Sequence, residues 1–520
     1  MKRSLSLLLI LATVVAVFAG CQTPAPTQEP QTTNQTATDG PKFDQWGRPW
    51  VDSVLPDGLN FGGQTVNILL AAGTHSYRDY YAEAYNDDII NDAVFDRNVK
   101  VETDLGVKLN WILGSETSAT TLPNEIAAVV KAGTNNYDIA AGYGNYMPKG
   151  VTKLSYTNLY DVPYLKDSLA QGKPWWNKTY VDEAGLNGLL YTITGDLSLS
   201  STHQISCMFF NKRLADKHLA AIGGSQGLYQ LVLEGKWTVD EFAQLAAPLY
   251  EDLNTNGQRG DLEDFYALIP WMPSSFANAF QYGMNAPVTQ KNAQGIPELV
   301  IGSQHTKDAL QKLNDLLHNC PGVLFDTRLY SYSSGSVLRE IRDKFPNGTV
   351  LFFAEALKEA TQLPNMTDSI GLLPMPMYDQ AQFEAKGYTA NVDDSFSTLV
   401  IPKGVLNAGR GQLAGATLEK LCEESYRTVT PNYFEAITKR PYLRTNDQDY
   451  DRQMYDIILD SAVFDFGMIY DELLEQPNYV ARQLIFRDKL LDFDSAWNQL
   501  RPTVEGKFKA LLSFYSKNTK

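Results

Sequence analysis

The sequence predicts an α/β protein, because short apolar segments alternate with segments of helical periodicity. Residues 65–71, 107–111 and 137–141 are apolar runs of strand length. Between them, residues 91–105 and 124–132 repeat apolar side chains at the spacing of an amphipathic helix. The order strand, helix, strand, helix, strand favours parallel pairing through right-handed crossovers. Ligands of such open sheets bind beyond the carboxyl ends of the strands.

The rest of the chain continues this alternation. A Thr-x-x-Glu pattern at Thr238 and Glu241 predicts a helix start, because the hydroxyl and the carboxylate can each accept a backbone N–H. From Leu413 onward the period is mostly helical. Neither a repeat nor a long linker divides the body, so two interleaved domains are expected. Further strands are predicted at 189–193, 207–210, 349–353, 370–374 and 397–401, and a helix at 211–220.

The N-terminus has the pattern of an export signal. Lys2 and Arg3 precede an uncharged apolar stretch, residues 5–18, which is shorter than the ~20 residues of a membrane span. The stretch ends in Phe-Ala-Gly-Cys, which resembles a bacterial lipobox except that Phe18 stands where Leu is usual. We therefore expect a signal peptide at 1–20 and a lipid on Cys21. The alternative is an ordinary secretory signal followed by a chance cysteine.

The segment after Cys21 has the composition of a disordered tether. Residues 22–40 are rich in Thr, Gln and Pro and have almost no apolar side chains, so they cannot bury enough surface to offset their chain entropy. We assign the tether to residues 21–60. It would hold the body outside the cell, at the outer face of the membrane.

Length and charge limit the class of protein. About 500 residues remain after the signal, which by ordinary domain sizes means at least two domains. The net charge of −16 and pI of about 4.9 argue against nucleic acid and against docking on anionic lipid. Beyond Cys21, the cysteines are Cys207, Cys320 and Cys422. An odd number without close spacing indicates neither a disulfide framework nor a zinc site, so buried small residues are predicted.

Several motifs, in order along the chain, carry a family resemblance. They are "AGTNNYDIA", "GLLYTITGDLSLS", "MFFNKRLADK", "GKWTVDEFAQLA", "GLLPMPMYD", "STLVIPKG" and "VTPNYFEAITKRPYLR". With the lipobox, this order resembles the carbohydrate-type (family 1) extracellular solute-binding lipoproteins of bacterial ABC importers. The resemblance extends from about Gln64 to the C-terminus. Its most specific pieces are 210–212, 235–238 and 373–376.

The resemblance implies a two-lobed, periplasmic-binding-protein-like fold of type II, with interleaved lobes joined by a multi-strand hinge. One lobe would hold 64–195 and 395–440, and the other 205–377 and 445–520. Crossings are implied near 192–206, 377–397 and 439–444, while insertions such as 331–347 blur the boundaries. A monomer would capture a carbohydrate, an oligosaccharide by expectation, between the lobes and pass it to permease subunits without catalysis.

Candidate ligand residues follow from strand ends and from the implied hinge. Tyr143 and Asn145 come directly after the third predicted strand, and Glu355 after a strand of the second lobe. Aromatic faces stack on sugar C–H groups, and planar polar side chains bond hydroxyls. The further candidates are Trp175, Trp176, Asp196, Trp271, Asp393 and Asp394, whereas Trp237 is assigned to packing because it precedes a helix cap.

Residues 252–263 fit the D-x-[DN]-x-[DN]-G-x5-E pattern of a calcium loop. Calcium prefers six to eight oxygen ligands. The side chains of Asp252, Asn254, Asn256 and Glu263 and the backbone carbonyl of Gln258 would supply them. A structural calcium ion is therefore predicted, with a metal-free Asn/Gly-rich turn as the alternative.

Two other functions stay open at this point. Carboxylate pairs are abundant in an acidic chain, so composition does not separate a binding protein from a glycoside-active enzyme. The sequence does lack the H-E-x-x-H and P-loop patterns. A surface carbohydrate-binding or sensor lipoprotein without transport would look the same in sequence.

Overall fold

The computed structural model describes residues 42–45, 47–72, 77–115, 118–327, 335–363, 366–438, 448–485 and 493–519. The described residues up to Trp50 and the described residues from Val51 onward belong to two separate units. In the first, Phe43 and Pro49 form an isolated antiparallel bridge and Asp44 pairs with Arg48 at 2.8 Å. The signal peptide, Cys21 and the crossing at 439–444 lie outside the described residues.

The end of the predicted tether is ordered, so the assignment of disorder to 21–60 is wrong at 51–60. The hydroxyl of Ser53 donates to Glu423 at 2.6 Å. The ammonium of Lys173 donates to the carbonyl of Asp52, also at 2.6 Å. The composition of the segment could not predict these hydrogen bonds, because their partners, Glu423 and Lys173, lie far away in the sequence.

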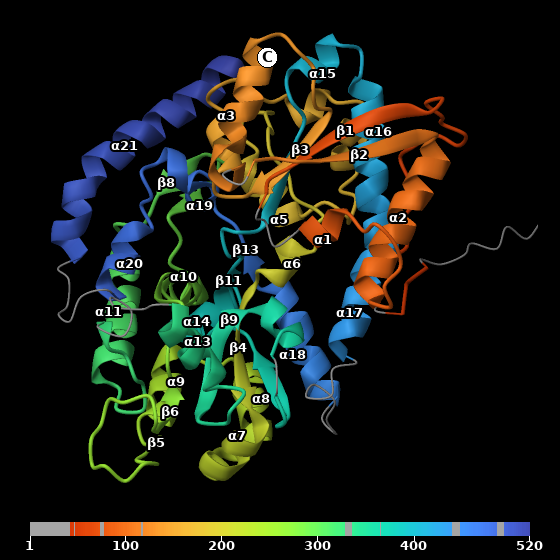
Figure 1. The fold of residues 1–520 in the computed structure, drawn as a ribbon. Coiled ribbons are helices and arrows are strands. Elements are labelled where there is room, and N and C mark those ends of the chain that lie inside the picture. Colours follow the sequence, from red (N-terminus) through yellow and green to blue (C-terminus); the bar gives the residue numbers. More distant parts are fainter. Residues whose placement is uncertain are drawn as a thin grey trace, which may run out of the picture. The chain divides into compact units, whose positions relative to one another are not determined.

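The first lobe is built on a four-stranded sheet in the order β12-β3-β1-β2. β1 is parallel to both β2 and β3, which confirms the predicted parallel core, and β12 joins antiparallel to β3. Figure 1 shows the sheet flanked by α3 on one side and by α2 and α16 on the other. The elements are β1 (Gln64–Leu70), β2 (Val107–Leu113), β3 (Ile139–Tyr143), β12 (Ser397–Val400), α1 (Tyr77–Tyr80), α2 (Ile89–Leu105), α3 (Ser118–Lys131), α4 (Leu165–Ala170), α5 (Lys178–Ala184), α15 (Gly404–Asn407), α16 (Gly411–Glu424) and α17 (Thr430–Thr438), with single turns η1 (Met147–Gly150), η2 (Leu159–Asp161) and η5 (Ser425–Val429).

The second lobe is built on a five-stranded sheet in the order β10-β4-β9-β6-β5. Only the β6–β9 pair is parallel; the other neighbours are antiparallel. The elements are β4 (Ser206–Asn211), β5 (Tyr250–Glu251), β6 (Phe265–Leu268), β9 (Val350–Ala356), β10 (Ile370–Leu373), α7 (Lys212–His218), α8 (Gly224–Leu233), α9 (Val239–Ala246), α10 (Pro273–Gly283), α11 (Gln304–Asn319), α13 (Gly335–Asp343), α14 (Gln380–Ala385) and α18 (Gln448–Asp460), with the hairpin β7 (Thr289–Lys291) and β8 (Pro297–Leu299) and the turns η3 (Ala220–Ile222) and η4 (Leu357–Thr361).

Helix α9 begins at the predicted cap residue, Thr238. The Thr238 hydroxyl accepts the backbone N–H of Glu241 at 3.2 Å and caps the helix. Trp237 is fully buried and donates its indole N–H to the carbonyl of Pro374 at 2.9 Å, which fits its assignment to packing. By contrast, the strand predicted at 189–193 is wrong: these residues make only isolated bridges, such as Ile193 with Leu399.

Several segments connect the two sheets. The chain passes from the first lobe through α6 (Ser200–His203) into β4, and returns through β11 (Ala390–Asn391) into β12. β11 pairs in parallel with β13 (Ala462–Val463). α17 packs on α2 of the first lobe, whereas α18 packs on β10 of the second. The C-terminal elements are α19 (Phe466–Ile469), η7 (Asp471–Leu473), α20 (Tyr479–Ile485) and α21 (Phe493–Asn518).

Two of the three cysteines match their predicted burial. Cys207 and Cys422 are fully buried and free, while Cys320 is partly exposed, with its thiol near the carbonyl of Ala243 at 3.6 Å. The prediction is therefore wrong for Cys320, which ends helix α11 at the surface. Among the described helices, none is both long and apolar enough to cross a membrane.

Candidate functional site

The loop between β11 and β12 lies against both lobes. The N–H of Asp393 donates to the carbonyl of Gln204, the residue that ends α6, at 2.8 Å. On the other side, the N–H of Asn145 donates to the carbonyl of Asp394 at 3.3 Å, directly after β3. The carboxyl end of a first-lobe strand and a crossing segment therefore meet at this loop, which is the position expected for a ligand in an open sheet.

Glu355 brings a carboxylate to the same place from the second lobe. It lies near the carboxyl end of β9, opposite Cys207 of β4, and accepts the N–H of Ala356 at 2.8 Å. Burial, with smaller contributions from Glu359 and Asp393, raises the pKa of Glu355 to about 7. The ammonium of Lys358, one turn on, donates to the side-chain oxygen of Gln204 at 3.1 Å.

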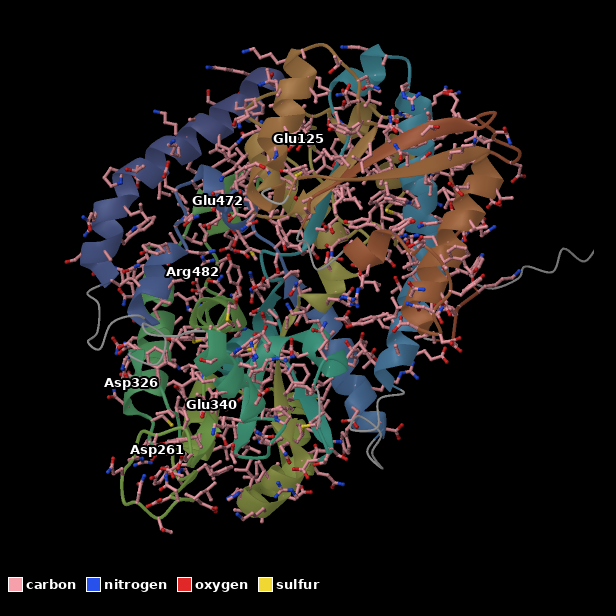
Figure 2. The ribbon with its side chains drawn as sticks, viewed as in Figure 1. Glu125, Asp261, Asp326, Glu340, Glu472 and Arg482 are labelled. Atoms are coloured by element: carbon pink, nitrogen blue, oxygen red, sulfur yellow. The ribbon has the colours of Figure 1, made fainter. Side chains whose placement is uncertain are left out.

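Asp393 and Asp394 continue this polar group. Asp393 accepts hydrogen bonds from the hydroxyls of Ser275 at 3.0 Å and Ser395 at 2.7 Å. Asp394 lies 3.5 Å from the guanidinium of Arg482 in α20. Burial and then Asp393 raise the pKa of Asp394 to about 6. Figure 2 shows Arg482 and Glu472 in the region between the two sheets.

His203 adds an aromatic partner at the end of α6. Its ring lies 4.1 Å from that of Tyr433 in α17, at an angle of 50°. Burial, aided by Lys358, lowers the pKa of His203 to about 3, so the imidazole is neutral at physiological pH. Within the described residues, neither His203 Nε2 nor the Tyr433 hydroxyl has a hydrogen-bond partner.

The group as a whole suits a ligand rich in hydroxyls. Carboxylate oxygens of Glu355 and Asp394 are acceptors, and the amide oxygen of Asn145 has no partner among the described residues. Arg482 Nε is a donor that likewise has no hydrogen-bond partner among the described residues. Acceptors and donors at a lobe boundary, with an aromatic pair beside them, can bond a polyol in a defined orientation.

The structure brings together Asn145 and Glu355, which were predicted from strand ends, and Asp393 and Asp394, which lie in the loop before β12. Tyr143, the last residue of β3, is half-buried and pairs with Ser397 of β12. No pattern in the sequence indicated the other four members of the group, Gln204, Lys358, Ser275 and Arg482. Lys358 could have been found from its position three residues after Glu355, but the other three depend on the path of the chain.

Trp175 and Trp176 are not at a binding surface, which corrects the prediction that they line a cleft. Trp175 is fully buried and Trp176 nearly so. Their indole N–H groups donate to the two carboxyl oxygens of Glu419 in α16, at 2.9 and 3.2 Å. Both rings are therefore committed to the core of the first lobe.

Asp196 and Trp271 contact residues outside the polar group. Asp196 accepts from the hydroxyl of Thr430 at 2.8 Å and so ties the first crossing to α17. Trp271 is half-buried, with its ring 6.2 Å from that of Phe353. The guanidinium of Arg342 lies 5.5 Å from the Trp271 ring centroid, so this contact competes with a sugar for the ring.

The predicted calcium loop folds as a chain of turns. Asp252 accepts the N–H of Gly257 at 2.8 Å, Asn254 that of Asn256 at 3.0 Å, and Asn256 that of Gln258 at 2.6 Å. Gly257 has a φ of 70°, which the turn requires. Glu263 accepts from the amide of Asn254 at 3.0 Å.

The donor set of this loop fits calcium in part. One oxygen of Asp252 is buried without a partner among the described residues. Nowhere in the described chain do three or more His, Cys, Asp or Glu side chains gather as metal ligands, so Asn254, Asn256 and backbone oxygens would have to complete the shell. Figure 2 shows Asp261 of this loop far from Arg482. Calcium binding stays a prediction, separate from the polar group.

Comparisons with known proteins identify the fold. No family model and no curated protein sequence matches this chain. Among solved structures, the sugar-binding protein MalE from Xanthomonas citri is 13% identical, with a TM-score of 0.56 over 88% of this chain and 100% of that one. The cyclic α-maltosyl-1,6-maltose binding protein from Arthrobacter globiformis is 12% identical, with a TM-score of 0.53 over 86% and 100%.

A third structure agrees with these two. The galacto-N-biose/lacto-N-biose I-binding protein of the ABC transporter from Bifidobacterium longum is 12% identical, with a TM-score of 0.52 over 86% of this chain and 99% of that one. At such identity the likeness shows the fold. The predicted fold class, a two-lobed periplasmic-binding-protein-like α/β architecture, is confirmed.

Proposed function

We propose that this chain is the lipid-anchored solute-binding component of an ABC importer and captures an oligosaccharide between its lobes. The observation that carries the proposal is the convergence of Asn145, Glu355 and Asp394, from the first lobe, the second lobe and the crossing between them. A ligand bound there would touch both lobes, so its binding would favour one angle between them.

Two further facts support a sugar. The structurally similar proteins from Xanthomonas, Arthrobacter and Bifidobacterium are all named as binding proteins for sugars, and the third for its ABC transporter. The donors and acceptors of the polar group are side chains of the kind that bond sugar hydroxyls. The same names describe binding proteins rather than enzymes, so we propose capture without catalysis, by a monomer.

The test is a thermal-shift screen of the full-length chain against mono- and oligosaccharides. A ligand at about 100 times its Kd adds about 2.7 kcal/mol to the free energy of unfolding, an easily measured shift in Tm. Stabilisation by a peptide and by no sugar would contradict the carbohydrate assignment. Hydrolysis of the stabilising glycan by the purified protein would contradict the absence of catalysis.

Transport itself needs a genetic test. A sensor or adhesin lipoprotein would bind sugar equally well, but its deletion would leave growth on that sugar unchanged. We expect deletion to abolish growth on the one sugar that stabilises the protein, and expression of the chain in trans to restore it. Unimpaired growth would favour the sensor.

A further inference from the structure

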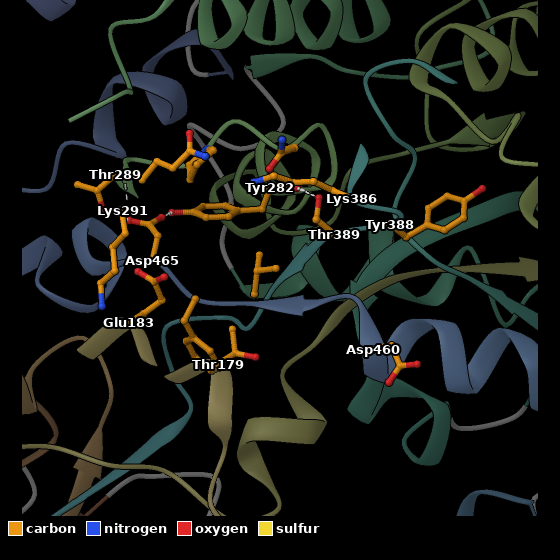
Figure 3. A pocket seen from close by; sticks show the side chains of 15 residues that line it. Thr179, Glu183, Tyr282, Thr289, Lys291, Lys386, Tyr388, Thr389, Asp460 and Asp465 are labelled. Carbon is orange, nitrogen blue, oxygen red and sulfur yellow. Dashed lines mark hydrogen bonds between the residues drawn. The ribbon is translucent and has the colours of Figure 1, made fainter. Parts of the chain in front are cut away.

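A cavity of ≈340 Å³ lies where α5 of the first lobe meets the β7–β8 hairpin of the second. Figure 3 shows Lys291 and Glu183 near Asp465 in this cavity. Asp465 is buried and accepts from the N–H and hydroxyl of Thr289 and from the hydroxyl of Tyr282, so it fixes the base of the hairpin. The hairpin is therefore a stiff projection from the second lobe toward the first.

Lys291 connects this projection to α5. Its ammonium donates to the carbonyl oxygens of Asp182 and Gly185, the latter at 3.0 Å, at the C-terminal end of the helix. Terminal helix carbonyls lack partners within the helix and attract cations. The Glu183 carboxylate faces the same ammonium and opposes the lowering of its pKa by burial.

The two ends of this contact belong to different lobes. α5 is tied to the first lobe, because the N–H of Asn177 donates to the carbonyl of Thr194 at 3.0 Å in the segment that bridges to β12. The hairpin belongs to the second lobe, because Val288, Ile301 of the following turn and Leu310 of α11 share one apolar cluster. Lys291 is thus an interlobe contact.

The long C-terminal helix makes a second connection. α21 has 26 residues, a length of about 39 Å. In its first half, Trp497 and Val504 pack in the second-lobe cluster with Leu310, and Asp494 pairs with Lys307 at 2.5 Å. Figure 1 shows α21 extending from the level of α20 to that of α3.

The second half of α21 reaches the first lobe. The ring of Tyr515 lies 6.0 Å from that of Tyr191, and the ring of Phe514 lies 6.1 Å from it. Next to Tyr191, the carbonyl of Leu190 accepts from Leu159 of the first lobe at 2.7 Å. Pro502 lies within the second-lobe contact region, between Trp497 and Val504, and the helix after Val504 carries Phe514 and Tyr515 to the first lobe.

We propose that Lys291 and α21 form a built-in restraint on movement of the lobes. A change in the angle between the lobes has to break the bonds of Lys291 to α5. It also has to bend α21 beyond Val504 or detach its C-terminal half from Tyr191. The restraint sets the ratio of lobe conformations in the free protein, and through that ratio it sets the affinity for ligand. The affinity part rests on the proposed function; the conformational part does not.

Distances between spin labels test the restraint without ligand. Nitroxides are placed at Lys131→Cys in the first lobe and Gln226→Cys in the second, both exposed, in the full-length chain carrying Cys320→Ser. In Lys291→Met we expect the population outside the main wild-type distance to rise about fivefold, the low end of ordinary coupling between sites. The matched control is Lys386→Met, an exposed lysine that lines the same cavity, and it should superimpose on wild type.

A second variant addresses α21. Tyr191→Leu keeps apolar bulk in the first lobe but removes the ring contacts to Phe514 and Tyr515. In Tyr191→Leu, too, we expect the population outside the main wild-type label distance to rise. The thermal unfolding curve should remain cooperative. Unchanged distance distributions in both folded variants would overturn the restraint.

The last measurement is the Kd of the sugar that the thermal-shift screen identifies. In Lys291→Met, this Kd should change by at most the factor by which the label distances show the ratio of lobe conformations to change. In Lys386→Met, the Kd should not change. Altered distances with an unaltered Kd would overturn the coupling to ligand. If no sugar binds wild type, the proposed function fails, while the label distances still decide the restraint.

Discussion

The indole N–H of Trp175 donates to the carboxyl group of Glu419 across 244 residues of sequence, at 2.9 Å. Trp176 donates to the second oxygen of the same carboxyl at 3.2 Å. The carboxyl is fully buried, and burial raises its pKa to about 8. At neutral pH Glu419 therefore holds a proton and joins α16 to the tryptophan pair as an uncharged group.

This proton makes the stability of the protein depend on pH. In the unfolded chain Glu419 has an ordinary pKa of about 4.3. From there up to about pH 8 the folded state binds one more proton than the unfolded state. The free energy of unfolding should therefore fall as pH rises through this window, by about 1.4 kcal/mol per pH unit from this group.

Glu419→Gln should remove that part of the slope, because the amide does not titrate; its single oxygen can accept from Trp175, and Trp176 keeps the hydroxyl of Ser168 as an acceptor at 2.8 Å. Denaturant unfolding at pH 5, 6, 7 and 8 measures it. The exposed Glu384→Gln is the control and should keep the wild-type slope. Equal slopes in all three proteins would show that Glu419 is ionised when folded.

Glu355→Gln should weaken binding of the sugar that the thermal-shift screen identifies. A hydrogen bond to a charged group contributes about 1.5–3 kcal/mol, so Kd should rise about ten- to a hundredfold. The free energy of unfolding at pH 8 should not fall, because the variant removes a buried charge. Calorimetric titration gives the Kd, with Glu384→Gln as the control; an unchanged Kd in Glu355→Gln would place the sugar elsewhere.

The calcium prediction for residues 252–263 has its own test. Calcium should bind with an affinity in the range of extracellular modules, about 10⁻⁴–10⁻³ M, because two of the side-chain ligands are uncharged. Ten times the Kd should stabilise the fold by about 1.4 kcal/mol. Glu263→Gln should abolish the calorimetric heat, whereas Glu298→Gln, in β8, should keep it. No heat in wild type, with no effect of a chelator on Tm, would leave the metal-free turn.

The lipid anchor predicts where the protein fractionates. Wild type should be found in the membrane fraction, with a mature N-terminus at Cys21 that carries a diacylglycerol mass. Cys21→Ala should move the protein to the soluble or culture fraction, because one anchor is removed and the body has an acidic net charge. Cys320→Ser should fractionate as wild type; a soluble wild type would indicate an ordinary secretory signal.

Sequence periodicity located the sheets because their strands are local features. The run predicted at 107–111 is β2 at Val107–Leu113, and the run at 65–71 is β1 at Gln64–Leu70. The segment at 189–193 has the same apolar character as these strands, and Leu190 and Ile193 are indeed buried. It fails as a strand because Leu399 meets it at a single bridge.

In the site, too, residues with a local sequence pattern could be predicted and residues placed by long-range contacts could not. Asn145 and Glu355 follow strands, so the rule for carboxyl ends of strands could find them. Arg482 lies on a short helix near the C-terminus, and its approach to Asp394 depends on how the whole chain returns to the hinge. The residue type of Trp175 suggested a sugar platform, but its burial is decided by Glu419, which no local pattern connects to it.

The edge strand β12 has a consequence for how the protein is made. Thr398 of β12 bonds Gly142 of β3, a neighbour 256 residues earlier in the chain. Synthesis delivers the N-terminal strands first, and long-range pairing is slow to form. The first sheet therefore stays one strand short until all five strands of the second-lobe sheet have been made. During that interval the unpaired edge of β3 is open to pairing with other chains.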